Sequence, residues 1–360
     1  MRILSLFAVG TLILHIQVAM PAHAAKTGKE KESSTPSAMK KPHKDPAEAD
    51  AAKARRIEET LDYGTQEERL RAIAGIPSIK DAGERAAVTK KLIAIMKDET
   101  DPDVLVKAMN ILGELKETSA IPLFIEKTAH QSEEVRTAAV YAIKGLKAKE
   151  ASARLESALK EQKMEDASNY TIALISTLAE LESKEILPFV KQAIENPTTH
   201  RTIREEMVLF LGKVASQESR DILLKIYTNE DEDTAIRSYA ANSLARLGYR
   251  DAAPAIRKAI QEIESYDFKK RQKYFNLHLY SIAALAKLGD EEAVPKLINA
   301  LRSNSAQVRL KAIALIKESK DKRTIDILRY KMKYDQNPKV RAEARKALEE
   351  MGVNTAEGKE

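Results

Sequence analysis

The stretch YDFKKRQKYFNLH, residues 266–278, concentrates side chains that could recognise a partner. Phe, Tyr and Trp make up only 5% of the 360 residues, yet four aromatic side chains occur within ten positions here, interleaved with four basic ones. Aromatic and arginine side chains dominate the binding energy of protein interfaces. The sequence therefore predicts a partner-binding site with the candidate residues Tyr266, Phe268, Lys269, Lys270, Arg271, Lys273 and Tyr274.

The same stretch has a second interpretation, in which it is local core. If it is helical, Phe268, Phe275 and Leu279 lie on nearly one face and pack against the flanking part of the chain. A combined arrangement, with Phe275 buried beneath exposed Tyr266, Lys270 and Arg271, satisfies both interpretations. The sequence leaves these alternatives open.

Residues for catalysis or metal binding are not concentrated anywhere else in the sequence. The chain has no Cys and six His, and it has neither a close pair of histidines nor a glycine-rich phosphate loop. The acidic run 230–233 lacks the later Gly and Glu of a calcium-binding loop, and is typical of acids preceding a helix. We predict no catalytic residue, no metal and no cofactor, and therefore no enzymatic activity.

A repeated pattern organises most of the chain. Each copy has a polar loop, an apolar residue with Arg, a small residue three positions later, and Leu or Ile at seven, which is one face of a helix. A second apolar helix follows. The spacing averages about 33 residues and predicts stacked helical hairpins. The Arg position of the nine copies is occupied by Arg69, Leu105, Arg136, Thr171, Arg204, Arg237, His278, Arg309 and Arg341.

Proline positions and one long step refine this pattern. Pro122, Pro188, Pro254 and Pro295 follow the last Leu of their copies and indicate helix starts. The step from Arg237 to His278 is the longest, so the aromatic and basic stretch is an insertion at 262–276. We expect it to extend the second helix of its repeat by about two turns. His278 then replaces an Arg by hydrogen bonding.

The N-terminal residues are typical of export. A positive start, an apolar run and Ala22-His23-Ala24 predict a signal peptide over 1–24, cleaved after Ala24, with no membrane-spanning segment in the mature chain. An uncleaved anchor is the alternative. The polar residues 25–52 are typical of a disordered linker, 53–352 form the repeats, and 353–360 a disordered tail. We expect a periplasmic or secreted protein.

The repeats resemble the HEAT family, and in particular the short HEAT-like repeats of phycobilin lyase subunits. The resemblance rests on DPDVLVKAMNILGELKETSAIPLF from Asp101 and IRSYAANSLARLGYRDAAPAI from Ile236, and covers about residues 55 to 352. It implies an all-α fold, a right-handed solenoid of about nine hairpins, whose inner face is lined by the second helix of each repeat. It also implies a structural ladder of ion pairs from Arg136, Arg204, Arg237, Arg309 and Arg341, with Asp233 and Asp335 as candidate partners.

Most proteins with such repeats are binding scaffolds, so the resemblance implies a scaffold or adaptor for cell-envelope proteins. A di-iron hydroxylase is excluded because no His is followed by Glu, and no residue can be given a bilin-handling role. With 60 basic and 54 acidic residues the surface is mixed, which argues against nucleic acid. Polyanion or envelope-polymer binding through 262–276 is the alternative, and a lyase-type enzyme subunit is a third.

Overall fold

The computed structural model describes residues 46–355, which form nineteen α-helices and no β-strand. The all-α fold predicted from the repeats is therefore confirmed. The predicted signal peptide, its cleavage site and linker residues 25–45 lie outside the described residues, as do residues 356–360. Among the residues described, no helix is long and apolar enough to cross a membrane.

The predicted linker is too long at its C-terminal end. The first helix begins at Pro46, so residues 46–52 are helical and not part of a linker. This segment is rich in Ala, which favours helix without needing burial. Further along the same helix, Ala54, Ile57 and Leu61 are buried and anchor it.

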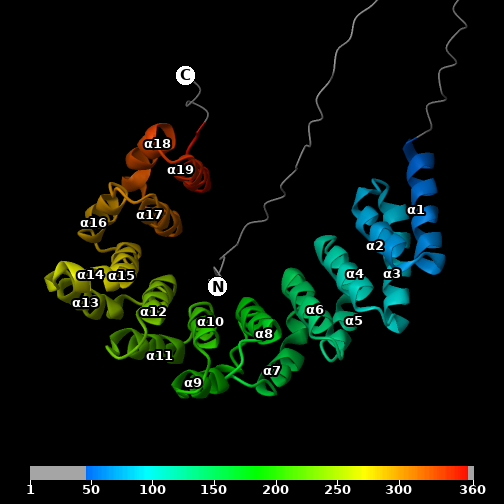
Figure 1. Ribbon diagram of the computed structural model, residues 1–360, viewed down its shortest axis with the longest axis horizontal. Coiled ribbons are helices and arrows are strands. Elements are labelled where there is room, and N and C mark those ends of the chain that lie inside the picture. Colours follow the sequence, from blue (N-terminus) through cyan, green and yellow to red (C-terminus); the bar gives the residue numbers. More distant parts are fainter. Residues whose placement is uncertain (1–45, 356–360) are drawn as a thin grey trace, which may run out of the picture. The chain divides into compact units, whose positions relative to one another are not determined.

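Within the unit that begins at Pro46, the helices form two rows (Figure 1). The outer row lies on the convex side and holds the helices that precede each Arg position. These helices are α1 (Pro46–Tyr63), α3 (Ala82–Asp98), α5 (Ile121–Lys127), α7 (Ser152–Lys160), α9 (Leu187–Glu195), α11 (Gln217–Thr228), α13 (Ala253–Ser265), α16 (Ala293–Ala300) and α18 (Ile325–Tyr334).

The inner row holds the helices that carry the nine Arg positions, and it lies on the concave side (Figure 1). Short 3-10 turns lead from several of these helices into the next outer helix. The inner helices are α2 (Gln66–Gly75), α4 (Pro102–Glu114), α6 (Glu133–Leu146), α8 (Asn169–Glu180), α10 (Arg201–Leu211), α12 (Thr234–Arg246), α15 (Phe275–Lys287), α17 (Ala306–Ser319) and α19 (Pro338–Glu350).

The hairpins number nine, but they are divided differently from the prediction. Each Arg-bearing helix packs on the outer helix before it, as α6 does on α5 and α12 on α11. The Arg-bearing helix is thus the second of its hairpin and lines the inner face, whereas the sequence analysis placed it first. The prolines mark the outer helices, since Pro122, Pro188 and Pro254 lie in the first turn of α5, α9 and α13.

Polar side chains in the loops fix where the inner helices begin. Eight of the nine inner helices have a side-chain N-cap, for example Thr65 in a capping box before α2 and Ser132 before α6. The exception is α15, which follows Tyr274 without a side-chain cap. The insertion therefore replaces the ordinary loop at this point of the row.

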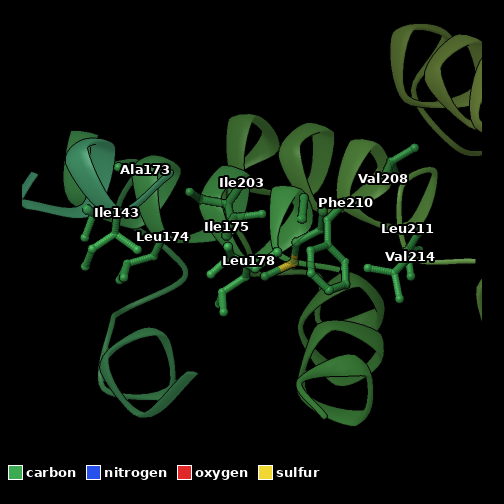
Figure 2. Close-up of a cluster of buried hydrophobic side chains, with 14 of the residues drawn as sticks. Ile143, Ala173, Leu174, Ile175, Leu178, Ile203, Val208, Phe210, Leu211 and Val214 are labelled. Carbon is green, nitrogen blue, oxygen red and sulfur yellow. The ribbon is translucent and has the colours of Figure 1, made fainter. Parts of the chain in front are cut away.

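Small residues let consecutive inner helices pack closely. Ala139 and Ala173 are fully buried, and so are Ala240 and Ala241. Larger apolar side chains fill the space between the two rows, and Figure 2 shows this core around α8 and α10, with Leu174, Ile175, Leu178, Ile203 and Phe210 pointing into it. Close packing on one side and large side chains on the other are consistent with a row that is concave along the inner helices.

Candidate partner-binding surface

The insertion forms a separate short helix, α14 (Phe268–Lys273), instead of lengthening a neighbouring helix. It lies between α13 and α15, so it precedes the Arg-bearing helix of its hairpin. Asp267 starts this helix, because its carboxylate accepts a hydrogen bond from the Lys270 amide at 2.9 Å, and the non-helical backbone of Tyr274 separates it from α15. The predicted two-turn extension of one helix was therefore wrong.

Two tyrosines of the insertion pack inward. The rings of Tyr266 and Tyr274 are half-buried and meet edge to face, with centroids 5.3 Å apart. Tyr266 Oη donates to Glu262 Oε1 at 2.5 Å, and this hydrogen bond raises the pKa of Tyr266 to about 12. The Lys270 ammonium lies 3.5 Å from the centre of the Tyr266 ring.

The remaining residues of the insertion are exposed. Phe268 is 76% exposed and Phe275 is 36% exposed, so the prediction that Phe275 anchors the insertion was wrong. Lys269 and Lys273 are exposed beside Phe268. Arg271 is also exposed, but its guanidinium donates to two carbonyls, those of Glu264 and Tyr266, at 2.8 Å each, and so ties the α13–α14 turn together.

The Arg positions are of two kinds. Arg204 pairs with Glu232, and the Arg309 guanidinium makes a two-point contact with Asp335, at 2.8 Å for each hydrogen bond. In both pairs the acid comes from the loop before the next inner helix. Arg69, which the predicted ladder did not include, makes the same kind of pair with Glu99. Each acid is at least nine-tenths buried.

The other members of the predicted ladder form no ion pair within residues 46–355. Arg136 donates to the carbonyls of His130 and Gln131, and Arg341 to those of Asp335 and Gln336. Arg237 is 6% exposed and its Nε donates to the Tyr227 carbonyl at 2.9 Å. Asp233, a predicted ladder acid, instead caps α12 and pairs with Arg201 at 3.1 Å.

His278 stands at an Arg position but turns to a different partner. Its Nε2 lies 3.2 Å from Glu264 Oε1, and the same carboxylate accepts from Lys296 at 2.7 Å. Burial lowers the pKa of His278, and the hydrogen bond with Glu264 opposes this. The side chain is thus a hydrogen-bonded substitute for Arg, and residues 46–355 contain no group of three or more His, Cys, Asp or Glu side chains that could hold a metal.

A second candidate surface, which the sequence did not reveal, runs along the inner row. It consists of side chains, at least partly exposed, on the inner helices from α6 to α17. The Tyr239 and Tyr280 rings meet edge to face at 6.2 Å, and the Lys311 ammonium lies 5.0 Å from the Tyr280 ring centre. We call this surface the inner strip, and its residues are Tyr141, Lys144, Glu206, Tyr239, Tyr280 and Lys311.

The small residues of α8 make a gap in the middle of the inner strip. Lys144 reaches over this helix, with its Nζ 3.0 Å from Ser176 Oγ. Tyr141, 46% exposed, lies beside Lys144, with the ammonium 5.9 Å from its ring centre. Glu206 lies across the gap on α10, and burial raises the pKa of its carboxyl while the charge of Lys144 opposes this.

A hollow of about 540 Å³ adjoins the N-terminal end of the inner strip, between α4, α6 and the start of α8. Asn110, Thr137, Tyr141 and Asn169 line it. The Thr137 hydroxyl is buried and has no hydrogen-bond partner within residues 46–355. Such a group stays unsatisfied unless water or a bound molecule supplies a partner.

The inner strip was not predicted from the sequence, because its tyrosines occur within apolar helices and are therefore expected to be buried in the core. A register signal was nevertheless present. Tyr239 and Tyr280 each stand two residues after an Arg position, as do Glu206 and Lys311. At the position two residues after the Arg position, α6 and α8 have Ala138 and Ala173, whereas these four helices have a polar or aromatic residue.

Comparison with protein families identifies the repeats. A family profile described as HEAT repeats matches residues 89–171 and 275–356, and one described as the vitellogenin TPR domain matches residues 147–250. The chain therefore carries HEAT repeats, as the resemblance implies. No curated protein sequence matches the chain.

Solved structures that are similar to this chain include a lyase complex, a karyopherin and a hydroxylase. The CpcE–CpcF complex of phycocyanin lyase from Nostoc sp. PCC7120 is 18% identical, with 81% of this chain and 100% of that one covered and a TM-score of 0.40. Karyopherin Kap121p bound to the SUMO protease Ulp1p is 14% identical, with coverages of 85% and 37% and a TM-score of 0.45. Human deoxyhypusine hydroxylase is 14% identical, with 85% and 98% covered and a TM-score of 0.32. Likenesses this distant do not indicate what the chain binds.

Proposed function

We propose that this HEAT-repeat chain is an exported, periplasmic scaffold or adaptor that binds a polypeptide segment of another cell-envelope protein along the inner strip. The observation that carries the proposal is the presence of tyrosine and lysine side chains on the inner helices from Tyr141 on α6 to Lys311 on α17, with Tyr239, Tyr280 and Lys311 in direct ring contact. Tyrosine supplies large contact area with little loss of conformational entropy, and its hydroxyl can bond a peptide backbone. Glu206 offers a hydrogen-bond acceptor, and Lys144 and Lys311 offer hydrogen-bond donors.

The bound segment is expected to be extended and to carry both polar and apolar side chains. A strip made of side chains from several inner helices offers separate contacts along its length, which suits a chain without internal packing. The 540 Å³ hollow beside Tyr141 can take one apolar or aromatic side chain of that segment. The exposed amide of Asn110 and the buried hydroxyl of Thr137 line the same hollow and can bond its backbone.

Site-specific photocrosslinking in cells tests this proposal. A photoreactive residue at Tyr141 or Tyr280 should capture the same envelope protein, whereas one at Lys258, exposed on the outer helix α13, should not. Tyr141→Ala and Tyr280→Ala should each weaken binding of that protein by about 1 kcal/mol or more. Capture only from Lys258 or from α14 would contradict the proposal.

Export and the absence of catalysis belong to the same proposal. N-terminal sequencing of the protein from the periplasmic fraction should begin at Ala25, and an intact N-terminus would favour the anchored alternative. We expect no enzymatic activity and no bound cofactor, and a chromophore or metal that co-purifies with the protein would favour the enzyme-subunit alternative.

A second candidate function, binding of an anionic envelope polymer, is favoured by the exposed face of α14. Phe268 is 76% exposed, and Lys269 and Lys273 of the same short helix are exposed as well. Residues 253–335 also contain 18 Lys and Arg against 10 Asp and Glu, so the positive charge of the chain is concentrated there. Affinity for such a polymer should fall steeply with salt and be reduced by Lys269→Gln with Lys273→Gln. Binding that is independent of salt would count against it.

A further inference from the structure

A small cavity lies where the insertion meets the edge of the helical rows. Its volume is about 240 Å³, and it is bounded by α12, α13, α14, α15 and the acidic loop before α12. This is below the roughly 300–1,000 Å³ of sites for drug-sized ligands, and well above the space that one water needs. Five charged side chains line it, namely Arg237, Lys270, Glu230, Asp231 and Glu262.

Arg237 is the buried charge of this cavity. Arg204 and Arg309 have a carboxylate from the following loop, whereas the one hydrogen bond of the Arg237 guanidinium among the described residues goes from its Nε to the Tyr227 carbonyl. By register, its acid would come from residues 263–267. Glu264 of that segment is held by His278 and Lys296, and Asp267 caps α14.

The charges around the cavity are not paired with one another. Within residues 46–355 no carboxylate oxygen lies within 4 Å of a charged nitrogen of Arg237 or Lys270. Glu262 accepts the Tyr266 hydroxyl, while Glu230 and Asp231 are exposed at the mouth of the cavity. Two cations and three carboxylates thus line one cavity without forming ion pairs across it.

We propose that this cavity binds a small zwitterion, a free α-amino acid. Its carboxylate would pair with Arg237 and Lys270, and its ammonium with Glu262 and the acids at the mouth. A simple anion is disfavoured by three carboxylates, and a simple cation by the buried guanidinium. An α-amino acid carries both charges a few ångströms apart, and so satisfies both sides at once.

The insertion makes this site possible. Tyr266 and Tyr274 of the insertion form the wall over Ile263 and Leu277, which close the apolar side. Arg271 ties the turn in place through two carbonyls. This inference is independent of the inner strip, because none of the cavity residues belongs to it.

Isothermal titration of the full-length mature protein with a panel of free L-α-amino acids tests the proposal. At least one should bind saturably at concentrations up to about 10 mM, which detects affinities down to the millimolar range. For the best binder, the amide without a carboxylate and the N-acetyl derivative without an ammonium should both bind at least about tenfold more weakly. Absence of binding by every amino acid would overturn the proposal, and so would equal binding by both derivatives.

Variants locate the site. Lys270→Met and Glu262→Gln should each weaken binding about tenfold, as expected for loss of one charge-assisted hydrogen bond. The matched control is Lys269→Met, which removes a neighbouring exposed lysine that does not line the cavity. Arg237→Lys, with folding checked by circular dichroism, should weaken binding further because it loses the two-point geometry. Unchanged affinity in Lys270→Met and Glu262→Gln would place the binding elsewhere and overturn the assignment.

Discussion

At the scale of single residues, burial separates side chains that the sequence makes look alike. Phe275 and Leu277 are two positions apart in the insertion region, yet Phe275 is 36% exposed and Leu277 is fully buried. Phe275→Ala should lower the free energy of unfolding by less than about 1 kcal/mol, whereas Leu277→Ala should lower it by about 2–5 kcal/mol. Urea denaturation measures both. Equal losses would show that Phe275 is packed.

The Arg309–Asp335 pair provides a prediction with a pH dependence. Burial raises the pKa of Asp335, but hydrogen bonds from Arg309, from the Asn337 amide and from Lys331 outweigh it and hold the pKa below its usual value. This carboxylate therefore stabilises the fold fully above its unfolded pKa of about 3.9, and the contribution is lost as pH falls through the folded value.

Asp335→Asn should lower the free energy of unfolding by about 3–5 kcal/mol at neutral pH, because it leaves the buried Arg309 without its counter-charge. The difference from the wild type should shrink at acid pH, where Asp335 itself becomes protonated. Urea denaturation at about pH 7 and about pH 3 compares the two conditions. Asp326→Asn, at an exposed acid on α18 with no ion pair among the described residues, is the control. A loss of the same size at both pH values would contradict the electrostatic explanation.

At the scale of elements, the repeats allowed the hairpins to be predicted, but not how they pair. The spacing of Arg and Leu fixes nine amphipathic helices, and the prolines fix the starts of several others. Which neighbouring helix a given helix packs against depends on how deeply the side chains on its two sides are buried. A single sequence does not show this. The start of the helix in the insertion could have been predicted, since Asp267 directly before Phe268 is an N-cap signal.

The candidate site could be predicted only in part for the same reason. The insertion was located correctly as an exception to the repeat, and Phe268 and its lysines are exposed. The inward packing of Tyr266 and Tyr274 and the cavity beneath them depend on contacts with α12 and α13. The cavity brings Arg237 on α12 and the acidic loop before α12 together with residues of the insertion that lie far along the sequence, so no local pattern encodes it.

Two glycines on the inner row test how closely its helices approach. A Cβ at Gly212, at the end of α10, would lie 2.6 Å from Ser243 Cβ and 3.1 Å from Ser243 Cα on α12. Gly212→Ala should therefore separate these helices and lower the free energy of unfolding by about 1–3 kcal/mol. A Cβ at Gly113 would lie 3.6 Å from Ala142 Cα, an ordinary contact, so Gly113→Ala should raise stability by about 0.5–1 kcal/mol. Thermal denaturation of both variants makes the comparison, and destabilisation by Gly113→Ala alone would contradict it.

At the scale of the whole repeat unit, charge is distributed unevenly although the fold is uniform. Residues 253–335 hold a clear excess of basic side chains, while the rest of the chain has slightly more acids than bases. The inner strip spans both parts, and the small cavity lies where the excess begins. One stack of similar hairpins can therefore carry separate surfaces for a polypeptide, a polymer and a small zwitterion, because each repeat varies its exposed residues without disturbing the core.

The stack also predicts how the protein responds to shortening. Each hairpin contacts only its neighbours, so removing residues 290–360 should leave the seven hairpins from α1 to α15 folded. The side of α15 that packs against α16 and α17 becomes exposed, so the urea concentration at the midpoint of unfolding should fall. The dependence of unfolding free energy on urea should decrease by about a fifth, in proportion to the surface no longer buried. Circular dichroism with urea titration measures both quantities. Loss of helical signal from the whole shortened chain would show that stability is shared over longer distances than a nearest-neighbour stack allows.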